Sequence, residues 1–431
     1  KRYLYMINTV NPQTKGLNGI IEIPADKSIS HRSSIFSALT HNKATIKNYS
    51  HGEDCLSTLN VLRALGVEAE FKNDKELIIN SPKKFTKPQT ILDAGNSGTT
   101  IRLMSGVLAS QDFESTITGD QSLQKRPMKR VITPLEMMGA KILSNNNKAP
   151  LTICGTRLHP IDYNYEIASA QVKSCILLAG MHACDGPTSF TEPFKSRDHT
   201  EKMLSYMNAD ITTNGNTVSI NPCLPEPKTL IIPGDISSAA FFMAAAAIVP
   251  NSDIILKNVN LNPTRTGIVD VMKQMGADIE ILDYRLECNE EVGDMRIKYS
   301  ELKGITIEKD IIPRLIDELP IIAVLATQAE GTTTVKDAQD LRNKESDRIK
   351  TICSELAKFN AKIKETPDGF IIEGKTKLTP SGMLECYHDH RLAMSMYVAG
   401  LIAGKPSQIN EFQWVNTSFP EFEALMERIR V

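Results

Sequence analysis

The apolar and polar positions of this chain follow a pattern that returns about every 70 residues. In each copy, apolar residues at helical spacing are followed by a Gly or Asn and then by alternating apolar and polar residues. This order predicts an amphipathic helix that ends at a residue with left-handed backbone, followed by a strand. The end positions are Gly66, Gly139, Asn208, Gly276 and Asn360, and residues 422–431 resemble the helical part of a sixth copy.

A second feature, a short polar segment before an unusually apolar stretch, recurs at the same interval. The stretches 241–249, 321–327 and 392–403 are apolar nearly all round, which is typical of helices packed inside a protein. The polar segments are centred on Ser28, Asn96, Ser169, Ser237, Asp317 and His390. The chain is therefore predicted to contain six repeated units, each with a buried helix, a surface helix and strands.

Six units in a chain of 431 residues predict an α/β fold of two similar domains, each with three repeated units and three buried helices. If the buried helices are parallel, their N-termini converge and present unpaired N–H groups and the positive ends of the helix dipoles. We therefore expect a cleft between the two domains that binds a ligand with several negative charges.

Helix capping is the alternative explanation of the polar segments, because Ser, Asp and Asn are common N-caps. The cations within these segments favour anion binding, because a cation at a helix N-terminus opposes the dipole unless an anion compensates it. These cations are Lys27, Arg32, Arg102, Lys173 and Arg391.

Composition excludes several classes of function. Lys and Arg number 49 against 51 Asp and Glu, a net charge of −2, so the chain has no overall basic field to hold a nucleic acid. The longest apolar run, 239–249, is far shorter than the ~20 residues that a membrane span needs. The first residues turn polar at Asn8, too early for the core of a signal peptide. The eight cysteines include no C-x-x-C pair, which predicts no metal site and a protein of the reducing cytoplasm.

Eight motifs follow one another along the chain, and together they make it similar to the 5-enolpyruvylshikimate-3-phosphate (EPSP) synthase family. The similarity extends from about Gly19 to the end of the sequence. The motifs are Asp-Lys-Ser-Ile-Ser-His-Arg at 26–32, Leu-Asp-Ala-Gly-Asn-Ser-Gly-Thr-Thr-Ile-Arg at 92–102, Gly-Asp and Arg-Pro-Met within 119–128, Ser-Ala-Gln-Val-Lys-Ser at 169–174, Asp-Glu-Leu-Pro at 317–320, Leu-Arg-Asn-Lys-Glu-Ser-Asp-Arg at 341–348, Asp-His-Arg at 389–391 and Thr-Ser-Phe-Pro at 417–420.

The resemblance implies a fold of two inside-out α/β barrels with buried parallel helices and an active site in the interdomain cleft. One domain would comprise 26–235 and the other 1–25 plus 236–431. The implied reaction transfers the enolpyruvyl group of phosphoenolpyruvate to the 5-hydroxyl of shikimate 3-phosphate and releases phosphate. No metal or organic cofactor is implied, and the partners are small anionic substrates rather than nucleic acid or membrane. Since six units need no partner subunit, we expect a monomer.

Shikimate 3-phosphate is expected, by position in the motifs, to contact a set of polar residues. Arg32 would hold its carboxylate by a forked contact, and Arg197 would lie near its phosphate. The set is Lys27, Ser28, Arg32, Ser169, Ala170, Gln171, Arg197, Asp317 and Lys344. Ala170 stands where many relatives have Ser, so one hydroxyl is missing there.

Phosphoenolpyruvate is expected to contact Lys27, Asn96, Gly98, Arg126, Gln171, Arg348 and Arg391. The segment 96–99 resembles a phosphate-binding turn, in which Gly lets backbone N–H groups approach an oxyanion. Many relatives have a further Lys where this chain has Ser418, so that contact is not carried over. In this family glyphosate competes with phosphoenolpyruvate, and these two departures leave the sensitivity of this chain open.

Catalysis requires a proton for the methylene carbon of phosphoenolpyruvate and a base for the attacking hydroxyl. Asp317 is expected to be the base, and either Glu345 or Lys27 the acid. The alternative for Glu345 is an ion pair with Arg348 at the start of a helix.

Two other functions compete with this one. The first is the sister enolpyruvyl transferase that acts on UDP-N-acetylglucosamine, which typically has a Cys in the loop at 119–128, where this chain has none. The second is a non-enzymatic anion-binding scaffold built from the same repeats. Such a scaffold would not explain why so many charged residues recur at the expected helix starts.

Overall fold

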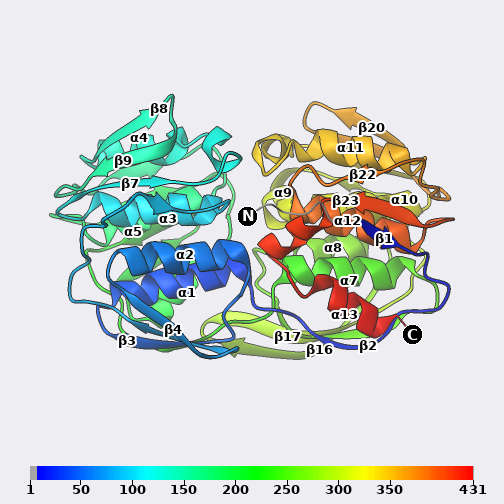
Figure 1. Cartoon of the computed structure of the whole chain (residues 1–431), viewed down its shortest axis with the longest axis horizontal. Helices are drawn as coiled ribbons and strands as arrows, with labels where there is room; N and C mark the ends of the chain where they lie inside the picture. The colour runs from blue at the N-terminus through cyan, green and yellow to red at the C-terminus, as the bar shows by residue number, and fades with distance from the viewer. Residues whose placement is uncertain (1–6, 431) are drawn as a thin grey trace. The chain divides into compact units, whose positions relative to one another are not determined.

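The computed structural model describes residues 7–430, which divide into two compact units (Figure 1). The N-unit comprises Ala25–Pro233 with Leu286–Glu290, and the C-unit comprises residues 7–24, Gly234–Arg285 and 291–430. Leu286–Glu290, which were expected to belong with 236–431, thus fall in the N-unit. The reason is local: Glu290 Oε1 lies 2.7 Å from Nδ1 of the buried His199, and Lys202 Nζ donates to the backbone oxygen of Asn289 at 3.2 Å.

The N-unit contains three four-stranded sheets of the same design. In each sheet the first two strands are parallel and the remaining neighbours are antiparallel. The strand orders are β14 (Thr229–Ile231), β3 (Lys43–Lys47), β5 (Glu76–Asn80), β4 (Glu68–Asn73); β6 (Leu92–Asp93), β7 (Glu114–Thr118), β9 (Lys148–Cys154), β8 (Lys141–Asn145); and β10 (Asp162–Asn164), β11 (Thr188–Thr191), β13 (Thr217–Ile220), β12 (Ile211–Asn214).

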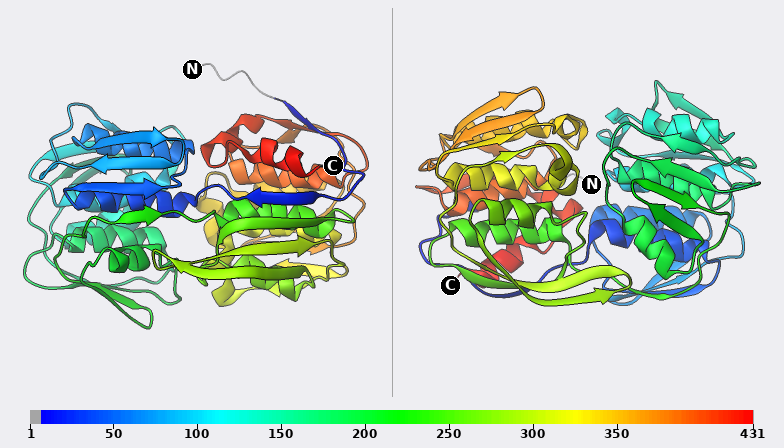
Figure 2. Two further views of the ribbon diagram at one scale, coloured as in Figure 1. Left: turned by 90° about the horizontal axis from the view of Figure 1, so that it is seen from below. Right: turned by 180° about the vertical axis from the view of Figure 1, so that it is seen from behind.

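The described part of the C-unit has three sheets of related design, and each again contains one parallel pair. The orders are β2 (Asn18–Glu22), β15 (Asp253–Asn260), β17 (Glu290–Lys298), β16 (Asp278–Glu287); β18 (Thr306–Ile307), β19 (Thr332–Val335), β21 (Gly369–Glu373), β20 (Lys362–Thr366); and β22 (Leu384–Glu385), β23 (Ser407–Asn410), β1 (Asn8–Val10). The first strands of the chain therefore complete two sheets that later segments build (Figure 2).

Each repeat supplies one buried helix and one surface helix. The buried helices are α1 (Lys27–Leu39), α3 (Gly98–Ala109) and α5 (Ala170–Gly180) in the N-unit, and α7 (Ile236–Ile248), α10 (Leu319–Gln328) and α12 (His390–Leu401) in the C-unit. The surface helices are α2 (Glu53–Ala64), α4 (Lys129–Met137), α6 (His199–Tyr206), α8 (Gly267–Gln274), α11 (Arg348–Lys358) and α13 (Phe422–Ile429), with a short α9 (Ile312–Leu315) beside them. The predicted alternation of buried and amphipathic helices is confirmed.

The ends of the surface helices confirm the predicted left-handed positions. The φ angles are +92° at Gly66, +100° at Gly139, +58° at Asn208, +97° at Gly276 and +64° at Asn360. Gly and Asn adopt this conformation at the lowest cost, so they stop the helix and turn the chain into the next strand.

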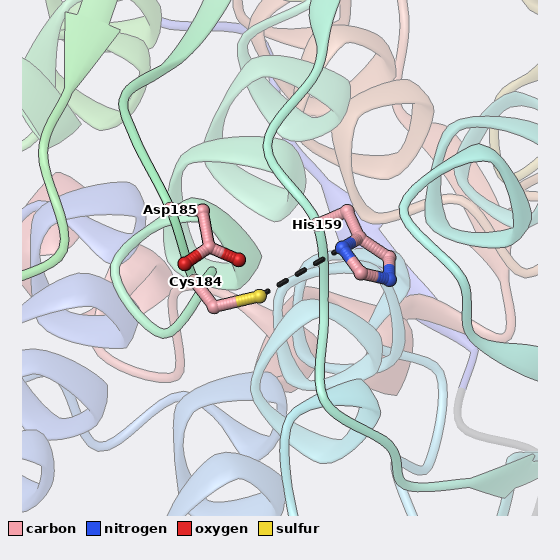
Figure 3. Close-up of side chains that lie close together, drawn as sticks. All are labelled: His159, Cys184 and Asp185. Atoms are coloured by element: carbon pink, nitrogen blue, oxygen red, sulfur yellow. Dashed lines mark hydrogen bonds between the residues drawn. The ribbon is translucent and has the colours of Figure 1, made fainter.

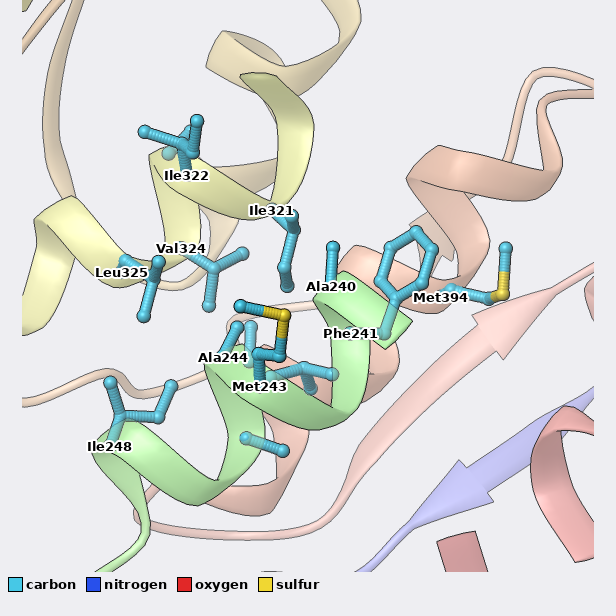
Figure 4. Close-up of a cluster of buried hydrophobic side chains, with 14 of the residues drawn as sticks. Ala240, Phe241, Met243, Ala244, Ile248, Ile321, Ile322, Val324, Leu325 and Met394 are labelled. Carbon is cyan, nitrogen blue, oxygen red and sulfur yellow. The ribbon is translucent and has the colours of Figure 1, made fainter. Parts of the chain in front are cut away.

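Each unit has one continuous hydrophobic core around its three buried helices. In the C-unit, Ala240, Met243 and Ala244 of α7 face Ile321 and Val324 of α10 (Figure 4). The small residues of α7 let its neighbours approach closely. A small residue also permits close helix packing in the N-unit. A Cβ on Gly106 of α3 would lie 2.2 Å from the backbone oxygen of Cys175 in α5, too close for any side chain. No helix among the described residues is both long and apolar enough to cross a membrane.

Candidate active site

The N-termini of the three buried helices of the N-unit converge, as their hydrogen bonds demonstrate. Gln171 at the start of α5 donates to Thr99 Oγ1 at the start of α3 at 3.0 Å. Arg32 in α1 donates to Ser174 Oγ in α5 at 2.9 Å. The helices are capped as well: the side chains of Asp26, Ser97 and Ser169 accept from backbone N–H groups of the first turns. The three buried helices of the N-unit are therefore both capped by side chains and brought together at their N-termini.

Two guanidinium groups flank Gly98 at the start of α3. Arg126 donates to Asn96 Oδ1 at 2.7 Å, and Arg102 donates to Gln171 Oε1. A Cβ placed on Gly98 would lie 3.0 Å from Arg102 Nη1 and 3.2 Å from Arg126 Nη1. Four of the residues expected to bind phosphoenolpyruvate thus lie together, and Arg102, which that set left out, lies with them.

The start of α1 carries the expected Lys27, Ser28 and Arg32, each held by protein groups. Lys27 Nζ donates to Asp54 Oδ2 in α2 at 2.5 Å. Arg32 is buried and donates to Thr200 Oγ1 at 2.8 Å, to Ser174, and to the backbone oxygen of Ser28 at 3.0 Å. Three neutral oxygen acceptors of the N-unit therefore orient the Arg32 guanidinium.

The start of α5 and the segment before α6 are joined through one buried carboxylate, Glu192. It accepts from the backbone N–H of Ser169 at 3.3 Å and from both the backbone N–H and the hydroxyl of Ser196, at 2.8 and 2.9 Å. Lys173 lies 2.9 Å from Glu192 and 2.7 Å from Glu201, and all three are buried. Lys173 is thus balanced by protein carboxylates, contrary to the expectation that a ligand compensates it. The network holds Ser169 and Ser196. Arg197, which is partly buried, follows Ser196 directly in the chain.

In the C-unit, the expected residues gather around the Asp317 carboxylate, which lies in a 3-10 turn (Ile316–Glu318) just before α10. Three cations face it: Arg348 Nη1 at 3.2 Å, Lys344 Nζ at 3.6 Å and Arg391 Nη2 at 4.0 Å. Glu345 Oε2 lies 2.6 Å from Arg348 Nη2, so the ion pair considered as the alternative for Glu345 exists.

Arg348 is the centre of this cluster. Its Nε donates to Oδ2 of the buried Asp389, the N-cap of α12, at 2.8 Å. Burial opposes the charged form of Arg348, but the carboxylates of Asp389, Glu345 and Asp317 outweigh it and raise the pKa of the guanidinium. Burial likewise opposes ionisation of Asp389, yet Arg348 holds the pKa of that carboxyl below its usual value. Arg348 and Asp389 therefore form a permanently charged pair.

The acidic partners are what sequence reasoning missed. Asp54, Glu192 and Glu201 were not predicted, and Asp389 was quoted only as part of a motif. Asp54 had one weak signal, its place in the acidic first turn of α2. The expected residues fall into two sets, one in each unit: Lys27, Ser28, Arg32, Asn96, Gly98, Arg126, Ser169, Ala170, Gln171 and Arg197 in the N-unit, and Asp317, Lys344, Glu345, Arg348 and Arg391 in the C-unit.

Comparison with known proteins identifies the family. The family model of EPSP synthase (3-phosphoshikimate 1-carboxyvinyltransferase) matches residues 12–426. A 3-phosphoshikimate 1-carboxyvinyltransferase from Thermoanaerobacter sp. strain X514 is 51% identical over 408 residues, 94% of this chain and 96% of that protein. One from Petrotoga mobilis is 49% identical over 424 residues, 97% of this chain and 98% of that protein.

Solved structures agree with the sequence comparison. An EPSP synthase from Acinetobacter baumannii superposes with a TM-score of 0.86 at 42% identity, over 99% of this chain and 98% of that one. The predicted two-domain α/β fold is thereby confirmed, and the sister UDP-sugar enzyme and the non-enzymatic scaffold are set aside. The chain belongs to the EPSP synthase family and is a transferase of the shikimate pathway.

Proposed function

We propose that the two residue sets act on one pair of substrates, and that the chain transfers the enolpyruvyl group of phosphoenolpyruvate to the 5-hydroxyl of shikimate 3-phosphate with release of phosphate. The observation that carries this proposal is the gathering of cations at buried helix starts in both units. Two substrates that each carry a phosphate and a carboxylate need such charge-assisted contacts.

In the N-unit, Arg126, Asn96 and the backbone at Gly98 bind phosphoenolpyruvate, and Lys27 contacts both substrates. The geometry at Gly98 supports this role, because the absence of a side chain leaves the helix N-terminus open between two guanidinium groups. Shikimate 3-phosphate is held by Ser28, Arg32, Ser169, Gln171 and Arg197 and by the backbone at Ala170. Glu192 orients this set, because it ties Ser169 to the segment before Arg197.

In the C-unit, Asp317 accepts the proton of the attacking hydroxyl, and Lys344, Arg348 and Arg391 bind anionic groups. Nearby cations favour the ionised form of a carboxylate, which is the form that can accept a proton. Glu345 or Lys27 delivers the proton to carbon. A pH–rate profile of Glu345→Gln separates these two, since loss of the alkaline limb assigns the acid to Glu345 and its persistence assigns it to Lys27.

A phosphate-release assay with and without shikimate 3-phosphate tests the proposal. Release must require both substrates, and Asp317→Asn should lower kcat by ~10²–10⁴. Asp340→Asn is the matched control, because Asp340 also faces Lys344, at 3.5 Å, and the same charge is removed. Phosphate release that is independent of shikimate 3-phosphate, or equal losses in both variants, would refute the assignment.

We propose further that the enzyme works as a monomer in the cytoplasm. The complete hydrophobic core in each unit supports the first statement, and eight unpaired cysteines support the second. Light scattering at working concentration tests the oligomeric state.

A further inference from the structure

One cluster of metal-binding side chains in the N-unit lies apart from every residue assigned above. His159, Cys184 and Asp185 are the group, among the described residues, whose possible ligand atoms all lie within 4.8 Å of one another (Figure 3). Cys184 Sγ is 3.7 Å from His159 Nδ1. We propose that these three side chains form a surface binding site for a borderline divalent metal ion of the zinc class.

The separation of the Cys184 and His159 ligand atoms fits binding of one shared ion. Zinc binds cysteine sulfur at ~2.3 Å and histidine nitrogen at ~2.0–2.1 Å in tetrahedral geometry, which puts the two ligand atoms about 3.5 Å apart. The Sγ–Nδ1 distance is within a few tenths of an ångström of that value. The carboxylate oxygen of Asp185 lies within 4.8 Å of the other two ligand atoms, so the Asp185 side chain must move closer to them to join the ion. Three protein ligands leave the fourth position to water.

The two segments that carry the ligands are already joined by the backbone. Cys184 donates its backbone N–H to the backbone oxygen of Leu158 at 2.9 Å, which places Cys184 beside His159 without any metal. Pro160 follows His159 directly and restricts its backbone. The metal therefore meets ligands whose chain segments need little ordering, and binding clamps the segment after β9 to the segment after α5.

The ligand types select the kind of ion. A thiolate and an imidazole favour Zn²⁺ or Co²⁺ over Mg²⁺ and Ca²⁺, which prefer oxygen. Arg157 Nη2 lies 3.6 Å from the Asp185 carboxylate, and both side chains are largely exposed, so breaking this ion pair costs little free energy. On binding, the metal–sulfur bond forms as the Cys184 thiol loses its proton to the buffer, so affinity falls as pH falls.

The sequence spacing of these ligands does not predict a metal site, because His159 and Cys184 are 25 residues apart and form no known metal-binding motif. None of the three belongs to the proposed catalytic or substrate-binding sets. Metal binding and enolpyruvyl transfer are therefore separable by experiment.

Titration of the metal-free chain with Co²⁺ tests the site, because a cobalt–thiolate bond produces a charge-transfer band in the near ultraviolet. The wild type should develop this band at one equivalent, and Zn²⁺ should abolish it by displacement. Cys184→Ser should lose the band, and His159→Gln should weaken Co²⁺ binding at least tenfold. Zn²⁺ should raise the melting temperature of the wild type but not of Cys184→Ser.

Cys154→Ser is the matched control, since Cys154 is also a partly exposed thiol beside a carboxylate, Glu114 Oε2 at 3.3 Å. It should keep the band unchanged. Circular dichroism and phosphate release, which all three variants should retain, verify folding. The proposal is overturned if the wild type gives no band, if the band survives Cys184→Ser, or if His159→Gln binds Co²⁺ as tightly as the wild type.

Discussion

Replacing Gly98 with Ala is the sharpest test of the proposed phosphoenolpyruvate pocket. The added methyl carbon would lie 3.0 Å from Arg102 Nη1 and 3.2 Å from Arg126 Nη1, nearer than ordinary van der Waals contact. Both guanidinium groups are buried and already bonded, Arg102 to Gln171 and Arg126 to Asn96. They must therefore shift by a few tenths of an ångström rather than swing away.

The size of the effect follows from that contact. Overpacking a tight site costs ~1–3 kcal/mol, and the obstacles here are side-chain ends rather than backbone, so the lower figure applies. A cost of about 1 kcal/mol corresponds to about a fivefold loss of affinity. We expect KM for phosphoenolpyruvate to rise about fivefold in Gly98→Ala, because Arg126 would be displaced from its position. KM for shikimate 3-phosphate should change little.

Initial rates with varied phosphoenolpyruvate at saturating shikimate 3-phosphate, and the reverse, give both constants. Gly382→Ala is the control, because a Cβ there meets no atom within 4 Å. An unchanged KM for phosphoenolpyruvate would mean that Gly98 does not line the pocket. Equal increases in both constants would mean that the methyl disturbs the N-unit as a whole, and either result would remove the assignment of residues 96–99.

Three further outcomes are expected. Lys173→Met leaves Glu192 and Glu201 buried without their cation and should lower the free energy of unfolding by ~3–5 kcal/mol in urea titrations; a loss below about 1 kcal/mol would contradict the buried pairing. Burial, with nearby Lys27 and Arg32, holds the pKa of His31 well below 6.5. The unfolded chain therefore binds more protons than the folded chain below that pH, so the free energy of unfolding should fall more steeply with falling pH in the wild type than in His31→Gln; equal pH dependence in the two proteins would refute this. Glyphosate is longer than phosphoenolpyruvate, so Gly98→Ala should raise the inhibition constant of glyphosate by a larger factor than KM for phosphoenolpyruvate. A smaller factor for glyphosate would count against a pocket shared by the two compounds.

The repeats were predictable because the signals that mark them are local. A helix end such as Gly139 or Asn360 is determined by a few neighbouring residues, and the backbone there has the predicted left-handed φ angle. The apolar character of the segment 241–249 likewise identified α7 as a buried helix. The placement of Leu286–Glu290 in the N-unit was not predictable, since it depends on contacts with residues about 90 positions earlier, such as His199.

The candidate site was predictable only in part, for the same reason. Motif order identified Lys27 and Arg348, but their carboxylate partners Asp54 and Asp389 lie 27 and 41 residues further along the chain. Periodicity carries no information about such pairs. The assumption that a cation at a helix start requires a bound anion failed at Lys173, where Glu192 supplies the compensating charge from within the protein.

In the C-unit, the cations proposed to bind substrate lie beside the carboxylates Asp389 and Asp317. In the proposed reaction, this pairing connects substrate binding with catalysis. Arg348 keeps Asp389 as a buried partner, so its charge and direction are fixed before any substrate arrives. Lys344 and Arg391 lie farther from Asp317, at 3.6 and 4.0 Å, and such longer contacts are the weaker ones. In the proposed reaction, an anionic substrate draws these two cations towards itself and away from Asp317. Because a carboxylate with fewer cations around it is a stronger base, we expect binding of the anion to make Asp317 better able to accept the proton of the hydroxyl in the proposed reaction.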